Sequence, residues 1–111
     1  MTKKYCLALD LKNDPALIAE YEKYHLEVWP EILASIKSSG ILNMEIYRWD
    51  TRLFMIMETT ENFSFERKAE SDASNRRVQE WEELMWKFQQ PLPGSPSGEK
   101  WKLMEKIFQL H

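Results

Sequence analysis

A chain of 111 residues is long enough for one domain with a buried core and too short for two. A hydrophobic share of 43% and a charged share of 30% are typical of a globular protein, and a net charge of −3 argues against a nucleic-acid binder, which needs a basic patch. The single cysteine, Cys6, excludes an internal disulfide and a cysteine-rich zinc site. No apolar run is long enough for a membrane span, and Asp10 interrupts the N-terminal apolar segment, so we expect a cytoplasmic protein.

The first part of the chain predicts a strand followed by a long helix. Residues 4–11 alternate bulky apolar side chains with smaller or polar ones, as in a strand with one buried face. Residues 13–15, Asn-Asp-Pro, form a typical helix start, and the helix is expected to run to about Ser38, just before a glycine. Pro30 cannot donate a backbone hydrogen bond, so it predicts a kink near Trp29.

The remainder predicts a hairpin, two helices and a last strand. Strands are expected at about 42–49 and 53–59, joined by a short turn, and the second has apolar residues on both faces. A short helix is expected at 62–70 and a longer one from Ala73 to Gln89. The predicted apolar stripe of the longer helix consists of Val78, Trp81, Met85 and Phe88. A loop at 90–99, rich in proline and glycine, leads to a final strand at 101–110.

The order strand, helix, strand, strand, helix, strand predicts one domain over residues 1–111, of the α+β class. It is typical of the ferredoxin-like βαββαβ arrangement, an antiparallel sheet with helices on one face. The other sheet face is too apolar to be left in water, so a second copy is expected to cover it. Two sheets packed face to face would make a homodimer of the dimeric α+β barrel type.

Tyr21 and His25 are the strongest candidates for chemistry. They are four residues apart, so on a helix they lie on the same face, which continues as the apolar inward stripe. One interpretation is a core histidine whose ring nitrogens bind the tyrosine or a backbone carbonyl. The other is a proton-transfer group that lines a small-molecule pocket, because the unperturbed pKa of histidine is close to physiological pH. The stretch alone leaves both open.

Other catalytic motifs are missing from the sequence. There is no nucleophile elbow, phosphate loop or dinucleotide fingerprint. His25-x-Glu27 matches half of a zinc deaminase motif, but the Pro-Cys-x-x-Cys half is absent, so no metal site is expected. Trp81 is by default a core residue, and a carboxylate such as Glu82 is more often exposed or paired than catalytic.

Several segments, in order and over nearly the whole chain, form a recognisable set. They are YHLEVWPEI at 24–32 with Tyr21 before it, Gly40-x-x-Asn43 leading into Ile46-Tyr47, Val78-Gln79-x-Trp81, and Met104-Glu105-x-Ile107-Phe108-x-Leu110. This set resembles the L-rhamnose mutarotase family. The resemblance implies a dimeric α+β barrel that interconverts the α and β anomers of 6-deoxy-L-sugars without a cofactor. Some close relatives are thought to act on L-fucose.

The resemblance also implies which residues form the site. The proton-donating histidine of the family falls on His25 and its sugar-contacting helix tyrosine on Tyr21. Of the family's pair of tryptophans, Trp81 is kept and Glu82 replaces the second ring. Met44 stands where the family has a tyrosine after a strand asparagine. The implied site therefore has His25 as the catalytic residue, the other four as substrate-binding residues, and no metal.

These residues suit the chemistry of anomer exchange. Ring opening needs one general acid and one general base, each of which accelerates the reaction about 10²–10⁴-fold. We expect His25 to be the acid, Tyr21 to orient the sugar or the imidazole, and Trp81 to stack on the apolar face of the sugar. The base stays open between Glu82 and a water. A carboxylate at 82 and a thioether at Met44 change two of the expected contacts, and they predict a preference for L-fucose over L-rhamnose.

Two other functions stay open on the sequence alone. A cofactor-free monooxygenase of the same barrel architecture would also place a histidine and a tryptophan in its cavity. A non-catalytic sugar-binding or sensor module would bind a sugar without changing the rate of anomer exchange.

Overall fold

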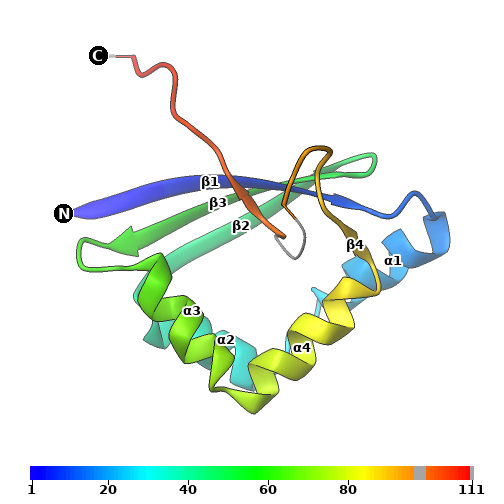
Figure 1. The fold of residues 1–111 in the computed structure, drawn as a ribbon, viewed down its shortest axis with the longest axis horizontal. Helices are drawn as coiled ribbons and strands as arrows, with labels where there is room; N and C mark the ends of the chain where they lie inside the picture. Colours follow the sequence, from blue (N-terminus) through cyan, green and yellow to red (C-terminus); the bar gives the residue numbers. More distant parts are fainter. Residues whose placement is uncertain (97–99, 111) are drawn as a thin grey trace.

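The computed structural model describes residues 1–96 and 100–110. Its elements are β1 (Thr2–Leu11), α1 (Pro15–Tyr24), α2 (Pro30–Ser38), β2 (Ile41–Trp49), β3 (Arg52–Thr60), α3 (Phe65–Ala73), α4 (Arg76–Trp86), β4 (Gln89–Gln90) and β5 (Lys102–Leu103). The strands form one antiparallel sheet in the order β2-β3-β1-β4, with β5 also paired to β1. All four helices lie on one side of this sheet (Figure 1), which confirms the predicted α+β class. None of the helices in the described ranges is both long and apolar enough to span a bilayer.

The three long strands form the frame of the sheet. β3 pairs with β1 from Thr2↔Thr60 to Asp10↔Arg52, and with β2 through the predicted hairpin. Asp50, in the turn of that hairpin, has a φ of 53°, a left-handed conformation that aspartate tolerates better than most residues. Alternate side chains face the helices and are buried: Leu7, Leu9 and Leu11 in β1, and Leu53, Met55 and Met57 in β3.

The single long helix that the sequence predicts is two helices in the structure. The chain breaks near Trp29, where only a kink was expected. α1 begins as expected, with Pro15 at its first position and the Asp14 carboxylate accepting from the backbone N–H of Ala16 at 2.9 Å. Trp29 is extended (φ −54°, ψ 137°) because it precedes a proline, so Pro30 starts a new helix instead of bending the old one. His25 is consequently the C-terminal capping residue of α1 and lies next to the break between α1 and α2.

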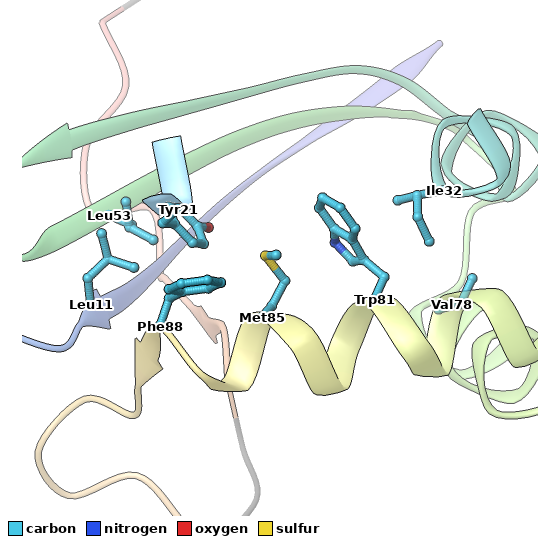
Figure 2. Close-up of a cluster of buried hydrophobic side chains, with 8 residues drawn as sticks. All are labelled: Leu11, Tyr21, Ile32, Leu53, Val78, Trp81, Met85 and Phe88. Atoms are coloured by element: carbon cyan, nitrogen blue, oxygen red, sulfur yellow. The ribbon is translucent and has the colours of Figure 1, made fainter. Parts of the chain in front are cut away.

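The helices after the hairpin begin at polar caps, and each helix starts three residues later than predicted. The Ser64 hydroxyl accepts from the N–H of Arg67 at the start of α3, and the Asn75 amide oxygen accepts from the N–H of Arg77 at the start of α4. The predicted apolar stripe is confirmed. Val78, Trp81, Met85 and Phe88 follow one side of α4 and its C-terminal extension and are buried against the sheet and α2 (Figure 2).

The prediction for the C-terminal part was wrong in two respects. Gln89 does not end the long helix but starts the short strand β4, which pairs with the end of β1. Of the predicted strand at 101–110, only Lys102–Leu103 is a strand, paired with Ala8 and Leu7 of β1, and the Met104 N–H donates one further bond to the Cys6 oxygen. Residues 104–110 continue as a tail on the side of the sheet away from the helices (Figure 1). Of the predicted loop at 90–99, residues 97–99 lie outside the described residues.

Candidate active site

A cavity of about 750 Å³ lies between the helices and the inner face of the sheet. Its walls include every residue that the sequence predicted for the site, namely Tyr21, His25, Met44, Trp81 and Glu82. These residues come from α1 and its cap, from β2 and from α4, so the fold joins three separate parts of the sequence at one place. The volume lies within the range of small-molecule sites, and most of the wall is apolar with a few polar groups.

Tyr21 and His25 form the polar centre of this wall. Their ring centroids are 4.3 Å apart, and Nδ1 of His25 lies 2.8 Å from the backbone carbonyl oxygen of Tyr21. Because a carbonyl oxygen only accepts hydrogen bonds, Nδ1 carries a proton and donates it, which leaves Nε2 as the nitrogen for chemistry. The histidine therefore combines features of both interpretations: one nitrogen is held by the backbone, and the ring lines a cavity.

The protonation states of these two side chains follow from their burial. Burial lowers the pKa of His25 below its ordinary value of 6.5, and the hydrogen bond to the Tyr21 carbonyl partly opposes this shift. The neutral imidazole is thus the resting form at pH 7, with a lone pair on Nε2, and it becomes an acid only after it has accepted a proton. Burial raises the pKa of Tyr21 to about 12, so its hydroxyl stays protonated and can donate a hydrogen bond.

Trp81 is held by an aromatic cluster beside His25. Its ring lies 5.7 Å from the His25 ring and 5.1 Å from the Trp29 ring, both in edge-to-face geometry. The guanidinium of Arg77 lies 4.1 Å over Trp29 and so fixes the outer end of the cluster. Trp81 is consequently a core residue that also presents part of its surface to the cavity.

Glu82 reaches the cavity with its carboxylate already paired. Lys100 Nζ donates to Oε2 of Glu82 at 2.7 Å and to its backbone oxygen at 2.9 Å, and the ammonium lies 4.7 Å from the centre of the Trp86 ring. A carboxylate in such a pair is a fixed hydrogen-bond acceptor, and its use as a base would require the pair to open. Across the described residues, no three carboxylate, histidine or cysteine side chains lie close enough to bind a metal ion together.

The sequence patterns did not point to several other wall residues. Gln89 in β4 and Lys100 in the segment before β5 are polar residues that belong to none of the motifs. Both line the cavity. A group of four methionines forms much of the apolar wall: Met44, Met55, Met57 and Met85. Alternation on β2 predicts that Met44 faces inward and the apolar stripe of α4 predicts the same of Met85, whereas β3 is apolar on both faces and its sequence does not decide which way Met55 and Met57 face.

Sequence comparison places this chain in a family. A model of the family described as L-rhamnose mutarotase matches residues 4–110. The chain belongs to that family. Among its mutarotase relatives, an L-fucose mutarotase from Xanthomonas campestris pv. campestris is 48% identical over 110 residues, which cover 97% of this chain and 88% of the relative. An L-rhamnose mutarotase from Oceanobacillus iheyensis is 33% identical over 75 residues, which cover 66% of this chain and 64% of the relative.

A solved structure of the same family shares the fold. The crystal structure of an L-rhamnose mutarotase from Formosa agariphila superposes with a TM-score of 0.71 and covers 98% of this chain and 99% of its own. The two sequences are 20% identical, so this likeness concerns the backbone alone. The mutarotase family that the sequence motifs resemble, and its α+β fold, are both confirmed.

Proposed function

We propose that this protein is a mutarotase that interconverts the α and β anomers of a 6-deoxy-L-hexose, with L-fucose preferred to L-rhamnose. The observation that carries the proposal is the histidine on the cavity wall. Nδ1 of His25 is tied to the Tyr21 carbonyl, which leaves Nε2 for proton transfer in a pocket of suitable size. Membership of the mutarotase family supplies the reaction type.

The reaction needs two proton transfers and no change of oxidation state. His25, expected from the sequence to be the acid, acts first as the base in this proposal, because its lowered pKa keeps the imidazole neutral. Its Nε2 accepts the proton of the anomeric hydroxyl while the bond between C1 and the ring oxygen breaks and C1 becomes an aldehyde. The ring oxygen takes a proton from a water in the cavity, and the hydroxide that this leaves takes the proton back when the ring closes. Rotation about the C1–C2 bond presents the other aldehyde face, and the same steps in reverse close the ring. The imidazolium then returns its proton and serves as the acid of the second half of the cycle.

The preference for L-fucose rests on two features of the wall. L-Fucose and L-rhamnose differ in the orientation of their hydroxyls at C2 and C4, so hydrogen bonding decides between them. Glu82 with Lys100 offers an acceptor and a donor, and Met44 offers an adaptable apolar contact. The greater identity and coverage of the Xanthomonas L-fucose mutarotase point the same way.

We also propose that the working form is a homodimer. On the face of the sheet away from the helices, Tyr47 and Trp49 are 54% and 83% exposed, close to partly exposed Phe54 and Ile56. The tail on that side carries further exposed apolar residues, with Ile107 93% and Phe108 75% exposed. A second copy packed on this face would cover these side chains and close two open sheets into one barrel.

Exchange spectroscopy tests the activity directly. In equilibrated L-fucose, L-rhamnose and D-glucose, saturation of one anomeric proton signal should transfer to the other when the protein is added. We expect transfer for the two deoxy sugars, faster for L-fucose, and none above background for D-glucose. Binding of L-fucose without accelerated exchange would instead favour the sugar-sensor function.

A further inference from the structure

Gln89, a residue of the cavity wall, has a buried polar atom that the fold does not satisfy. The residue is 4% exposed, starts β4, and lines the same cavity as Tyr21 and His25. Its Nε2 donates to the Tyr21 hydroxyl at 3.5 Å, whereas its Oε1 is buried with no hydrogen-bond partner among the described residues. Buried amide oxygens are nearly always hydrogen-bonded, so this one calls for a partner that the protein itself does not supply.

A purely structural role does not account for the amide. The bond to Tyr21 is at the long limit for a hydrogen bond and uses one of the four hydrogen-bonding positions of the side chain. The surroundings are apolar, with Phe88 fully buried next to it and Leu11 paired with it across the sheet. A methionine of similar length would fill this place without leaving an unpaired acceptor.

Gln89 and Tyr21 together offer complementary groups to a ligand. Because the Tyr21 oxygen accepts from Gln89, its own proton is directed to another acceptor, and Oε1 of Gln89 accepts from another donor. If the amide is turned over, the phenol donates to Oε1 and Nε2 becomes the group that is left, so one polar atom of each side chain still serves the ligand. Neighbouring hydroxyls of a hexose, each of which donates and accepts, match this pair.

We propose that Gln89 is a substrate-binding residue that, with Tyr21, recognises a hydroxyl of the sugar ring other than the reacting one. This inference rests on the proposed mutarotase function and adds a specificity residue to it. An amide does not transfer protons in this reaction, so Gln89 contributes to the binding of the sugar and not to the chemical step.

Gln89→Met tests the proposal, with Gln90→Met as the matched control because Gln90 is the exposed neighbour in the same strand and does not line the cavity. Exchange rates are measured by NMR over a range of L-fucose concentrations, and melting temperatures on the same samples. For Gln89→Met we expect KM to rise tenfold or more, kcat to change less than threefold, and the melting temperature to stay or rise. For Gln90→Met we expect no change. Unchanged KM for Gln89→Met, with or without a lower melting temperature, would overturn the proposal.

Deoxy sugars identify the hydroxyl and guard against an indirect effect. The 2-, 3- and 4-deoxy analogues of L-fucose are compared on wild type and on Gln89→Met. If Gln89 binds one hydroxyl, the two proteins converge on the analogue that lacks it and differ on the others. A uniform loss on all analogues would contradict the proposal and indicate a distorted pocket. Should Gln89→Met not fold, the double variant with Tyr21→Phe removes both partners of the buried bond, and Tyr21→Phe alone is its reference. No exchange by wild type would refute the mutarotase function itself, before Gln89 is considered.

Discussion

Replacing His25 with asparagine separates the two roles of the imidazole. The asparagine amide can lie where the Nδ1 side of the ring lies and donate to the Tyr21 carbonyl, but it has no titratable nitrogen in place of Nε2. We expect exchange to fall about 10²–10⁴-fold, the usual contribution of general acid–base catalysis. That loss corresponds to about 3–5 kcal/mol of transition-state stabilisation.

His25→Asn should also cost some stability, but less than it costs in transition-state stabilisation. The ring of His25 packs against Tyr21 at 4.3 Å and Trp81 at 5.7 Å, and such ring pairs contribute about 0.5–1.5 kcal/mol each. We expect His25→Asn to lower the free energy of unfolding by about 1–3 kcal/mol, and His25→Ala by about 1 kcal/mol more, because alanine also loses the hydrogen bond. Urea unfolding on the samples used for NMR exchange gives both values.

Tyr24→Phe is the matched control for this experiment. Tyr24 lies in the same helix, its ring packs on Trp81 at 6.3 Å and on Phe88 at 5.8 Å, and the phenylalanine keeps those contacts. It should retain full exchange. If folded His25→Asn exchanges anomers within threefold of wild type, the imidazole is not the proton-transfer group. An equal loss in Tyr24→Phe, which removes only a hydroxyl, would mean that the loss in His25→Asn cannot be assigned to Nε2 of the imidazole.

Three further predictions follow from the site and the open sheet face. Burial lowers the pKa of His25 below 6.5, and the neutral imidazole reacts first. The value of kcat/KM should therefore be constant near pH 7 and fall tenfold per pH unit once the pH is below the pKa of His25. A rise of kcat/KM on acidification would show that the imidazolium acts first. Glu82→Trp should narrow or reverse the preference for L-fucose without abolishing exchange, whereas Glu83→Trp, on the exposed side of α4, should not; equal, unaltered rates on both sugars would mean that Glu82 does not contact the substrate. Ending the chain at Leu103 removes the exposed apolar tail and should weaken the proposed dimer at least tenfold in sedimentation velocity; an undisturbed mass of two chains would place the interface elsewhere.

The elements of this fold were predictable where one local rule decided them. Alternation of side chains identified β1 and β2, the short turn after β2 and an apolar run identified β3, and the Asp14-Pro15 start identified α1. The break before Pro30 was read as a kink, because a proline can either bend a helix or begin one, and the extended conformation of Trp29 decides between these outcomes. The predicted last strand is too long, because an alternating pattern does not show how far a segment stays paired, and here the pairing with β1 ends at Leu103.

The candidate site was predictable only as far as motifs reach. Tyr21 and His25 share a helical face, and Trp81 and Glu82 are neighbours, so the resemblance could carry them over together. Gln89 meets Tyr21 across 68 positions of sequence through a two-residue strand, and no local pattern encodes that contact. The roles of all five predicted residues, and the cytoplasmic location, stay predictions.

The methionine-rich wall of the cavity has a practical consequence. Four of the six methionines line the cavity, while Met1 and Met104 lie outside it. A thioether chain changes rotamer at little cost, so this wall can adjust to the axial or equatorial hydroxyls of different deoxy sugars without moving the backbone. The same sulfur atoms are oxidisable, and conversion to sulfoxides would make the wall polar and chiral. Methyl labelling of methionine would therefore place four spectroscopic reporters in the pocket and two references outside it, all in the unaltered sequence.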